Sequence, residues 1–378
     1  MAAGSFAGLT VTASAAANIV GHVYVDDNTA GANTIGAFDR HSDGSLTPMA
    51  GSPFEAGGAG TGSIVGSQGA IQLSSDGRYL LAVDAGSNQI SVLRILPDGS
   101  LRLAGGGPVW SGGIEPISIA VNGSLVYVAN EGDKSTGGGS NYTGFRLNPG
   151  GRLFPLTGST FDLPSTANPG DILFNSTGTS LIGIEVGTAS PDTFRIDSFQ
   201  VGPDGRLTAA AGSPYPAQAA GPFGSEFSPA NPQHLFVSNA HGGAAKGSVS
   251  AFKVTAAGTL SPIGSSPYPD GQTAPCWVEI SHDGRYLFTV NTGSTTISSY
   301  TIQADGSLIY ASTTAFKSGA GIRPFDARLD PAGNNLYVVD AAIGSISAFA
   351  VSGGTLSEPA QSPFALPSDA KPFGIAVN

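Results

Sequence analysis

Charged side chains stand in segments of this chain that otherwise have the pattern of buried β-strands. Six such segments contain a proline, and aligning them on it brings together the residues two and four positions further on. The residues of interest at these positions are Asp171, Trp277 and Asp326, followed by Glu226, Glu279 and Arg328. Side chains two residues apart lie on one face of a strand, so these groups are expected to share a surface. Charges of both signs on buried strands are costly unless they are paired or solvated.

Two interpretations of these charges remain open. In the structural one, Arg328 bridges carboxylates in a water-filled channel and holds neighbouring segments together. In the functional one, the charges line a polar pocket that binds a small anionic or polyhydroxy ligand. Arg323 and Lys371 directly precede two of the prolines and would then bind a carboxylate or an oxyanion. His241, or a glutamate with a raised pKa, would move the proton.

The functional interpretation predicts a specific set of site residues. The catalytic candidates are His241, Glu226 and Glu279. The substrate-binding candidates are Arg323, Lys371, Arg328, Asp171, Asp326, Trp277 and Glu131. Glu131 and Lys134 come from a loop that is expected on the same face as His241. A single histidine in a loop is more often simply solvated than functional. The sequence lacks a Gly-x-x-x-x-Gly-Lys loop, a His-Glu-x-x-His motif and a serine flanked by glycines at both second neighbours. We therefore expect no metal and no cofactor.

The elements that position these residues follow from an internal repeat. A turn ending in Gly-x-Leu recurs seven times, and its leucines are separated by 55, 52, 54, 53, 48 and 48 residues. These leucines are Leu46, Leu101, Leu153, Leu207, Leu260, Leu308 and Leu356. Each copy contains three strand-like segments and a weaker fourth. Four antiparallel strands in about 50 residues, repeated seven times, predict an all-β, seven-bladed β-propeller.

The two ends of the chain indicate how the ring closes. The first copy, from Val20, lacks an inner strand, and the chain ends on a segment, 371–377, that matches the inner strand at 323–329. The C-terminal strand is therefore expected to complete the N-terminal blade and so remove two sheet edges. We expect residues 19–378 to form one propeller domain. Residues 1–18 are small and uncharged near a signal-peptidase-like Ala-Ser-Ala-Ala-Ala run, which indicates a signal remnant or a disordered extension.

Residues that recur in every copy are explained by the blade. The predicted second strands end in Asp26, Asp84, Asn130, Glu185, Asn239, Asn291 and Asp340. We interpret these residues as turn formers that bond their own backbone. The Asp-Gly turns and the Ser-Pro-Phe or Ser-Pro-Tyr ends are likewise architectural.

Composition excludes several classes of function. With 16 basic and 27 acidic residues, the net charge of −11 repels nucleic acid, and no Lys/Arg cluster overrides it. The single cysteine, Cys276, excludes an internal disulfide and is expected to be a buried small hydrophobe. No stretch is long and apolar enough to span a bilayer, so no membrane partner is expected. We expect a monomer that is secreted or periplasmic, or cytoplasmic if residues 1–18 are not a signal remnant.

Two near-identical copies, Leu73-Ser-Ser-Asp-Gly-Arg-Tyr-Leu-Leu-Ala-Val83 and Ile280-Ser-His-Asp-Gly-Arg-Tyr-Leu-Phe-Thr-Val290, carry a family resemblance. With the Gly-Ser-Pro-aromatic ends and Asp-Gly-Ser-Leu turns, they resemble the seven-bladed propeller lactonases, which include 6-phosphogluconolactonase-like proteins and carboxy-muconate lactonizing enzymes. The resemblance implies a metal-free active site of His, Arg and Glu at the channel mouth. Sugar lactonases of the family place His and an Arg-His pair where this chain has Gly170, Phe223 and Gly224.

The resemblance and the residues together favour one function over another. We expect a cofactor-independent lactonase-like enzyme, acting by lactone hydrolysis or the related lactonizing isomerase or lyase chemistry. Its substrate would be small and polar or anionic and would bind at the mouth of the central channel. The alternative is a non-catalytic exported propeller that binds a ligand or a protein through the same face.

Overall fold

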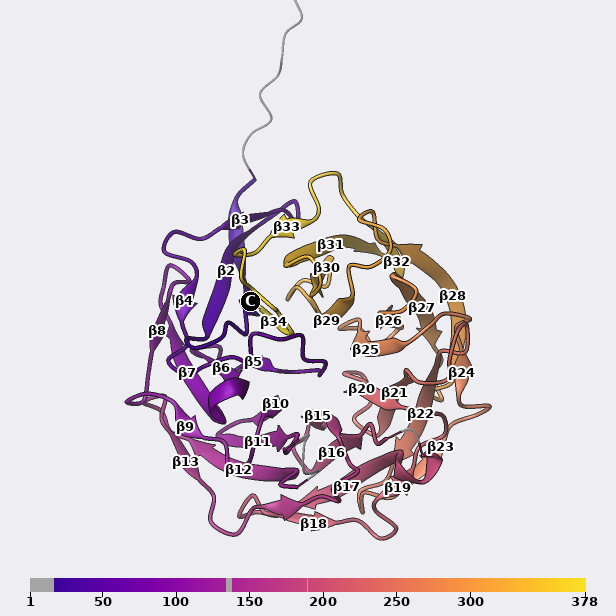
Figure 1. The fold of residues 1–378 in the computed structure, drawn as a ribbon. Helices are drawn as coiled ribbons and strands as arrows, with labels where there is room; N and C mark the ends of the chain where they lie inside the picture. The colour runs from indigo at the N-terminus through magenta and orange to yellow at the C-terminus, as the bar shows by residue number, and fades with distance from the viewer. Residues whose placement is uncertain (1–16, 134–137, 189) are drawn as a thin grey trace, which may run out of the picture.

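The computed structural model describes residues 17–133, 138–188 and 190–378. These residues form seven antiparallel sheets arranged as blades around a central axis (Figure 1). The predicted all-β, seven-bladed propeller is thus confirmed. The two helical turns in the described ranges are short 3-10 segments, η1 (Ala85–Ser87) and η2 (Pro191–Thr193). No helix of the described chain is long and apolar enough to cross a membrane.

The blades follow one another along the chain, and blades 2 to 7 each begin with their innermost strand, whereas the innermost strand of blade 1 comes from the C-terminus. Blade 1 consists of β34 (Gly374–Val377), β1 (Ile19–Asp26), β2 (Thr34–His41), β3 (Leu46–Pro48) and β4 (Phe54–Glu55). Blade 2 consists of β5 (Ile71–Leu73), β6 (Tyr79–Asp84), β7 (Gln89–Ile95), β8 (Leu101–Leu103) and β9 (Val109–Trp110). Blade 3 consists of β10 (Pro116–Asn122), β11 (Leu125–Asn130), β12 (Asn141–Leu147), β13 (Leu153–Pro155) and β14 (Phe161–Asp162). Blade 4 consists of β15 (Pro169–Phe174), β16 (Ser180–Glu185), β17 (Arg195–Val201), β18 (Leu207–Ala209) and β19 (Tyr215–Pro216).

The last three blades repeat this plan. Blade 5 consists of β20 (Pro222–Phe227), β21 (His234–Asn239), β22 (Ser248–Val254), β23 (Leu260–Pro262) and β24 (Tyr268–Pro269). Blade 6 consists of β25 (Pro275–Ile280), β26 (Tyr286–Asn291), β27 (Thr296–Ile302) and β28 (Leu308–Ala315). Blade 7 consists of β29 (Pro324–Leu329), β30 (Asn335–Asp340), β31 (Ser345–Ser352), β32 (Thr355–Ser357) and β33 (Phe364–Ala365). In blade 6 the fourth strand, β28, is continuous. In each of the other described blades, two short strands pair with the third strand in its place.

The ring closes as the sequence predicts. Strand β34 at the C-terminus pairs antiparallel with β1, with Val23 opposite Val377 and Asp26 opposite Gly374. The backbone N–H of His22 also donates to the Oδ1 atom of Asn378 (2.8 Å). In Figure 1 the indigo start and the yellow end of the chain accordingly meet in one blade. This pairing removes the exposed sheet edges that β1 and β34 would otherwise have.

The Ser-Pro-aromatic ends have an architectural role. The fourth strand is interrupted between its two short segments, which leaves a backbone N–H of the third strand without a strand partner. The serine hydroxyl accepts that hydrogen bond: Ser52 from Ala37 (2.8 Å), and Ser362 from Ala348 (3.0 Å). A serine therefore recurs at this position because a buried N–H needs an acceptor.

The residues that end the second strands are structural, but the predicted bonding is wrong for most of them. Of these side chains, Asp26 follows the prediction, because its Oδ1 atom accepts from the backbone N–H of Asn28. In other blades the side chain bonds the third strand instead, as Asp340 does with the hydroxyls of Ser345 and Ser347. The reason is the register: the second-strand residue lies directly opposite the start of the third strand, within reach of hydroxyls that sequence spacing alone does not reveal.

The propeller has two distinct faces, which we name by their connections. The loop face carries the loops from the second to the third strands, and each inner strand begins there. The turn face carries the tight turns from the inner to the second strands, such as 74–78 and 281–285, and each inner strand ends there. A side chain's position along an inner strand therefore decides which face it can serve.

Candidate functional site

A segment of the long connection between β4 and β5 crosses the central channel. The hydroxyl of Ser67 donates to the carbonyl of Ile117 in blade 3 (2.6 Å). The backbone N–H of Gln68 donates to the carbonyl of Gly170 in blade 4 (3.0 Å). The N–H of Gly69 donates to the Oδ2 atom of Asp326 in blade 7 (3.2 Å). We name Ser67–Gly69 the crossing segment, and it separates the two faces of the channel.

The side chain of Gln68 fixes the crossing segment at its centre. Its Nε2 donates to the carbonyls of Ser225 (2.8 Å) and Val278 (3.2 Å), and its Oε1 accepts from the N–H of Val278 (3.1 Å). The residue is 2% exposed. Its carboxamide thus pairs with Val278 as a strand backbone would. The sequence held one signal of this feature, because the blade 2 copy lacks the inner-strand proline. In the structure the inner strand of that blade, β5, is accordingly short.

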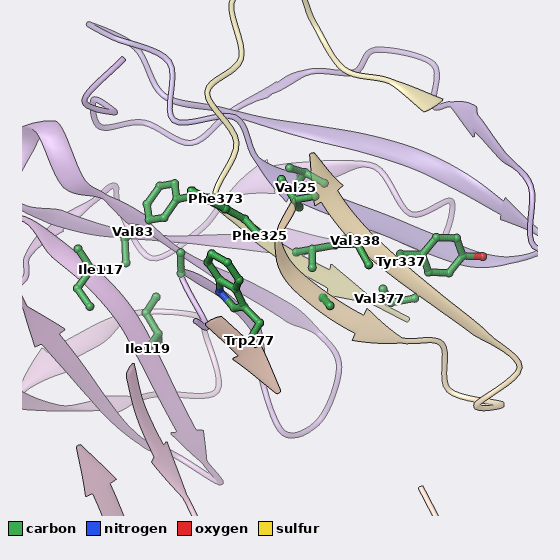
Figure 2. Packing of buried hydrophobic residues seen from close by; sticks show 14 of the residues in the cluster. Val25, Val83, Ile117, Ile119, Trp277, Phe325, Tyr337, Val338, Phe373 and Val377 are labelled. Atoms are coloured by element: carbon green, nitrogen blue, oxygen red, sulfur yellow. The ribbon is translucent and has the colours of Figure 1, made fainter. Parts of the chain in front are cut away.

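Aromatic side chains fill the channel on the loop-face side of the crossing segment. Trp277 is 1% exposed, and its indole N–H donates to the carbonyl of Ser67 (2.8 Å). Its ring lies 5.3 Å from that of Phe223 and 4.6 Å from that of Phe325, and Figure 2 shows Trp277 beside Phe325 among other buried side chains. Trp277 was predicted to bind substrate. The structure instead places it in the packed core, where it plugs the channel.

A polar cavity of about 290 Å³ lies on the turn-face side. Polar side chains of the crossing segment and of four blades share its wall with apolar residues of three inner strands. The lining residues are Gln68, Gln72, Leu73, Ile119, Ala120, Val121, Asp171, Ile172, Leu173, Phe174, Ser225, Glu226 and Arg328. Because Leu73 and Phe174 end their inner strands, the cavity belongs to the turn face rather than to the loop face.

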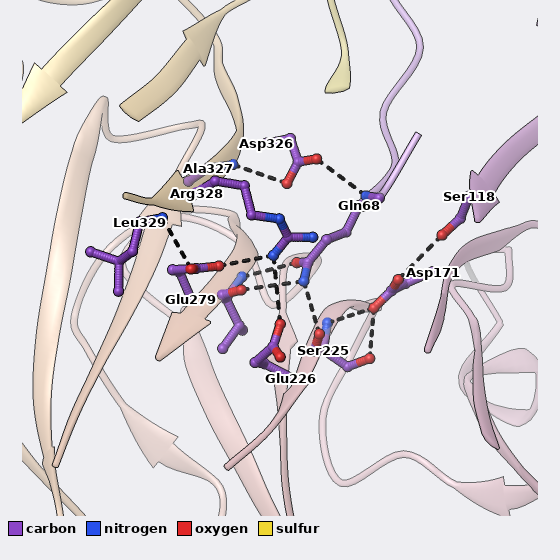
Figure 3. Close-up of polar contacts among 12 residues, drawn as sticks. Gln68, Ser118, Asp171, Ser225, Glu226, Glu279, Asp326, Ala327, Arg328 and Leu329 are labelled. Carbon is purple, nitrogen blue, oxygen red and sulfur yellow. Dashed lines mark hydrogen bonds and ion pairs between the residues drawn. The ribbon is translucent and has the colours of Figure 1, made fainter. Parts of the chain in front are cut away.

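Arg328 on β29 is the one basic residue in this lining (Figure 3). Its Nη1 atom lies 2.9 Å from the Oε2 atom of Glu279 and 3.7 Å from that of Glu226. Within the described chain its Nε and Nη2 atoms donate to no protein acceptor, although a guanidinium carries five N–H donors. Arg328 is therefore both anchored and able to bind a ligand.

The two glutamates that contact Arg328 differ in their freedom. Glu279 is 8% exposed, and both of its oxygens are occupied, since Oε1 accepts from the N–H of Leu329 (3.1 Å). Glu226 has a side chain 30% exposed, and within the described chain its carboxyl receives only the 3.7 Å ion pair. Both were predicted to be catalytic. The structure leaves Glu226 available to a ligand and gives Glu279 the geometry of a positioning residue that holds Arg328.

Two buried aspartates, Asp171 and Asp326, lie near Arg328 and hold neighbouring segments together. Asp171 accepts from the hydroxyl and the N–H of Ser225 (2.7 and 2.9 Å) and from the hydroxyl of Ser118 (3.3 Å). Asp326 accepts from the N–H groups of Gly69 and Ala327. These bonds link blades 3, 4 and 5 on one side and tie blade 7 to the crossing segment on the other. Both aspartates thus hold neighbouring segments together, but through hydroxyl and backbone N–H groups rather than through the predicted bridge by Arg328.

The electrostatics follow from burying four carboxyls near one guanidinium. Burial raises the pKa of Glu226 to about 8 and that of Asp171 to about 7, although Arg328 opposes both shifts. Burial also raises the pKa of Asp326 to about 6, again opposed by Arg328. For Arg328, burial disfavours the charge, yet the carboxylates of Glu279, Asp326 and Glu226 hold its pKa above the usual value. A glutamate with a pKa near neutral is suited to proton transfer.

The remaining predicted residues are not brought into this cavity. Arg323 is exposed on the loop face, with its guanidinium 5.6 Å from the ring centre of Phe325. Lys371 borders a separate cavity of about 190 Å³ that Ile343 also lines.

Two more predicted residues come from loops that follow second strands. His241 borders another cavity, of about 520 Å³, with Phe194, and burial lowers the pKa of its imidazole. The backbone N–H of Glu131 donates to the carbonyl of Glu115 (2.9 Å). Lys134, in the same loop as Glu131, lies outside the described residues. The sequence thus assigned one site to residues that the structure divides between two faces.

The single cysteine and the metal prediction can also be placed. Cys276 is 8% exposed, as expected for a buried hydrophobe, and burial raises the pKa of its thiol to about 12. Its Sγ donates to the carbonyl of Ala274. Such a thiol is not activated as a nucleophile. In the described ranges, no three His, Cys, Asp or Glu side chains are grouped so as to hold a metal ion.

The fold and the cavity define a propeller with a polar pocket on its axis, and the sequence match agrees. The family model for "Lactonase, 7-bladed beta-propeller" matches residues 31–164 and 217–369. The chain therefore belongs to this lactonase family. No sequence among the curated proteins matches it.

Solved structures share the fold at low sequence identity. A protein of Bacteroides fragilis, provisionally assigned as a 6-phosphogluconolactonase, is 18% identical with a TM-score of 0.74, over 97% of this chain and all of that one. A Bacteroides uniformis protein with the same provisional assignment is 21% identical, with a TM-score of 0.74 over 96% of this chain and all of that one. The periplasmic gluconolactonase of Pseudomonas aeruginosa is 16% identical, with a TM-score of 0.69 over 94% and 98% of the two chains. At these identities the likeness shows the fold alone.

The positions where the resemblance implies His and Arg-His have a different use in this chain. Gly170 supplies the carbonyl that accepts from the N–H of Gln68. Phe223 packs on Trp277, and a Cβ atom at Gly224 would lie 2.2 Å from the Oε1 atom of Gln68. The crossing segment thus requires glycine at 224. On the loop-face half of the channel, this chain therefore has packed glycine and aromatic residues where the resemblance implies catalytic side chains.

Proposed function

We propose that the protein is a cofactor-independent lactone-acting enzyme whose substrate binds in the turn-face cavity. Membership of the lactonase family supports the reaction class. The observation that carries the assignment is the state of Glu226, which, of the four carboxyls around Arg328, is the one left free of hydrogen bonds by the described chain. It faces the same cavity as the free Nε and Nη2 donors of Arg328.

In the proposed hydrolysis, Glu226 acts as the general base and Arg328 stabilises the oxyanion. Glu226 takes a proton from water while the water oxygen bonds to the lactone carbonyl carbon. The carbonyl oxygen becomes an alkoxide that accepts hydrogen bonds from Arg328. Collapse of this adduct breaks the ring C–O bond, and the leaving alkoxide takes the proton from Glu226. The hydroxy acid then ionises and releases a proton to solvent; the reverse sequence forms a lactone.

The test is proton release by the purified protein with aldonolactones, muconolactones and simple γ- and δ-lactones. Glu226→Gln keeps the size of the side chain and is expected to lower kcat by about 10²- to 10⁴-fold, as loss of a general base does. Arg285→Met, at an exposed turn, is the control. The wild-type rate should rise as the pH passes through about 8, the pKa of Glu226, and should level off above it, and the variant should lose this dependence.

The loop face offers the competing location, and the same assay separates the two. If Arg323→Ala and His241→Ala abolish turnover while Glu226→Gln does not, the enzyme uses the loop face and the turn-face assignment is wrong. If no lactone reacts, the result favours the second candidate function, that of a non-catalytic propeller that binds a ligand or a protein. Phe223 stands at a position where sugar lactonases are implied to carry a catalytic side chain, and its packing against Trp277 favours that candidate.

Location and assembly are part of the proposal. We infer that the protein is exported, supported by the small uncharged residues before β1, which lie mostly outside the described residues. We further infer that it acts as a monomer on a small molecule and binds neither nucleic acid nor membrane, supported by its net charge of −11. Cell fractionation and light scattering test these statements.

A further inference from the structure

The turn-face cavity has an excess of negative groups. Asp171 and Glu226 line it together with the single guanidinium of Arg328, and the carboxyls of Glu279 and Asp326 lie near Arg328 behind the lining (Figure 3). The described lining contains no lysine and no histidine. An anionic ligand would therefore meet two carboxyls and one cation, with two further carboxyls close to that cation.

That cation is already committed to the protein. Glu279 holds the Nη1 atom of Arg328 at 2.9 Å and is itself fixed by the backbone N–H of Leu329 at 3.1 Å. A ligand phosphate or carboxylate could reach only the Nε and Nη2 donors, on a guanidinium whose charge Glu279 already balances. The Nε and Nη2 donors that remain suit a carbonyl or hydroxyl oxygen, which needs one or two hydrogen bonds and brings no charge.

The rest of the polar wall also suits hydroxyl groups. The carboxamide of Gln72 lines the cavity and makes no hydrogen bond to the described protein, so it offers both donors and an acceptor. Glu226 adds a carboxyl free of hydrogen bonds. Apolar side chains such as Ile119 and Leu173 line the cavity between these groups. With a volume of about 290 Å³, the cavity lies at the lower limit for ligand sites.

We propose that this cavity selects neutral, hydroxyl-rich ligands of monosaccharide size and discriminates against ligands that carry a phosphate or an additional carboxylate. The substrate class is then a neutral polyhydroxy lactone, a statement that rests on the proposed function. The expectation from the sequence that the ligand could be anionic is not supported by the charges of this cavity. The same charges favour release of the product, because hydrolysis turns a neutral lactone into a carboxylate inside an acidic pocket.

The test is a binding experiment that needs no turnover. D-glucitol and D-glucitol 6-phosphate differ by one phosphate, and neither can react as a lactone. Calorimetric titration at pH 9, above the pKa values of Glu226 and Asp171, and at low ionic strength is expected to give a Kd at least tenfold lower for D-glucitol, and the difference should shrink in 0.5 M salt. Glu226→Gln and Asp171→Asn remove charge at constant size and should each narrow the ratio by strengthening binding of the phosphate. Asp204→Asn, at an exposed turn, is the matched control and should leave the ratio unchanged.

Each outcome decides the proposal. Equal or tighter binding of the phosphate by the wild-type protein would overturn it, and so would failure of D-glucitol to bind at all. If D-glucitol binds selectively but no lactone is hydrolysed, the ligand class stands and the proposed function fails. If lactones are hydrolysed but the 6-phosphorylated lactone is preferred, the function stands and the ligand class fails.

Discussion

Removing Arg328 should destabilise the protein in a strongly pH-dependent way. Arg328→Met keeps the length and apolar stem of the side chain but leaves Glu279 without its 2.9 Å partner in a site where it is 8% exposed. Breaking a buried ion pair by removing one partner costs about 3–5 kcal/mol. The side chain of Arg328 is 20% exposed, so the lower end, about 3 kcal/mol at pH 8, is the appropriate estimate.

The pH dependence follows from the carboxyls that lose their cation. Without Arg328 the pKa values of Glu226, Asp171 and Asp326 rise further, so the folded state holds more protons than the unfolded chain over a wider range. Stability then falls as pH rises through those values, by about 1.4 kcal/mol per pH unit for each additional proton bound. At pH 5 the carboxyls are protonated in the folded variant, and the cost should decrease to about 1 kcal/mol.

The assay is thermal unfolding followed by circular dichroism at pH 5 and pH 8. For 378 residues, an unfolding entropy of about 2.1 cal/mol/K per residue gives roughly 0.8 kcal/mol/K, so 3 kcal/mol lowers Tm by about 4 °C. Arg206→Met breaks an ion pair of 2.6 Å whose side chains are 46% and 53% exposed, and it should shift Tm by less than about 1 °C. Equal shifts for the two variants, or a shift for Arg328→Met that is the same at both pH values, would refute the reasoning.

Three further predictions concern the crossing segment and the buried polar groups of the blades. Gln68→Leu leaves the N–H and carbonyl of Val278 and the carbonyl of Ser225 without their partner. It should lower the free energy of unfolding, measured by chemical denaturation, by about 2–4 kcal/mol. A decrease below about 0.5 kcal/mol would mean that this side chain does not hold the crossing segment. Ser362→Ala removes the acceptor for the N–H of Ala348 and should cost about 1 kcal/mol, whereas Ser357→Ala at an exposed position should be neutral. Burial beside Asp197 raises the pKa of Glu185 from 4.5 to about 8. The free energy of unfolding should therefore fall as pH rises from about 4.5 to 8. Glu185→Gln should reduce this slope in denaturation experiments across the same pH range.

The fold could be predicted from the sequence because repetition reports it directly. The leucine of each Gly-x-Leu turn marks one blade, and the match between 323–329 and 371–377 indicates which strand closes the ring. Strand alternation likewise placed Glu226, Glu279 and Arg328 on one surface, and the structure joins them through the guanidinium. These are properties of local period and spacing, which the chain carries without reference to its tertiary structure.

The tertiary structure decided which face holds the cavity and which residues are free within it. The blade 2 copy shows only that its proline is missing, whereas the fold shows that Gln68 crosses the axis and bonds Val278, 210 residues away. That crossing, with Trp277 packed above it, separates Arg323 on the loop face from Arg328 on the turn face, although the two are five residues apart in the sequence. Hydrogen bonds then occupy Glu279 and leave Glu226 free. Such differences depend on contacts between distant blades, so residue type and spacing alone cannot specify them.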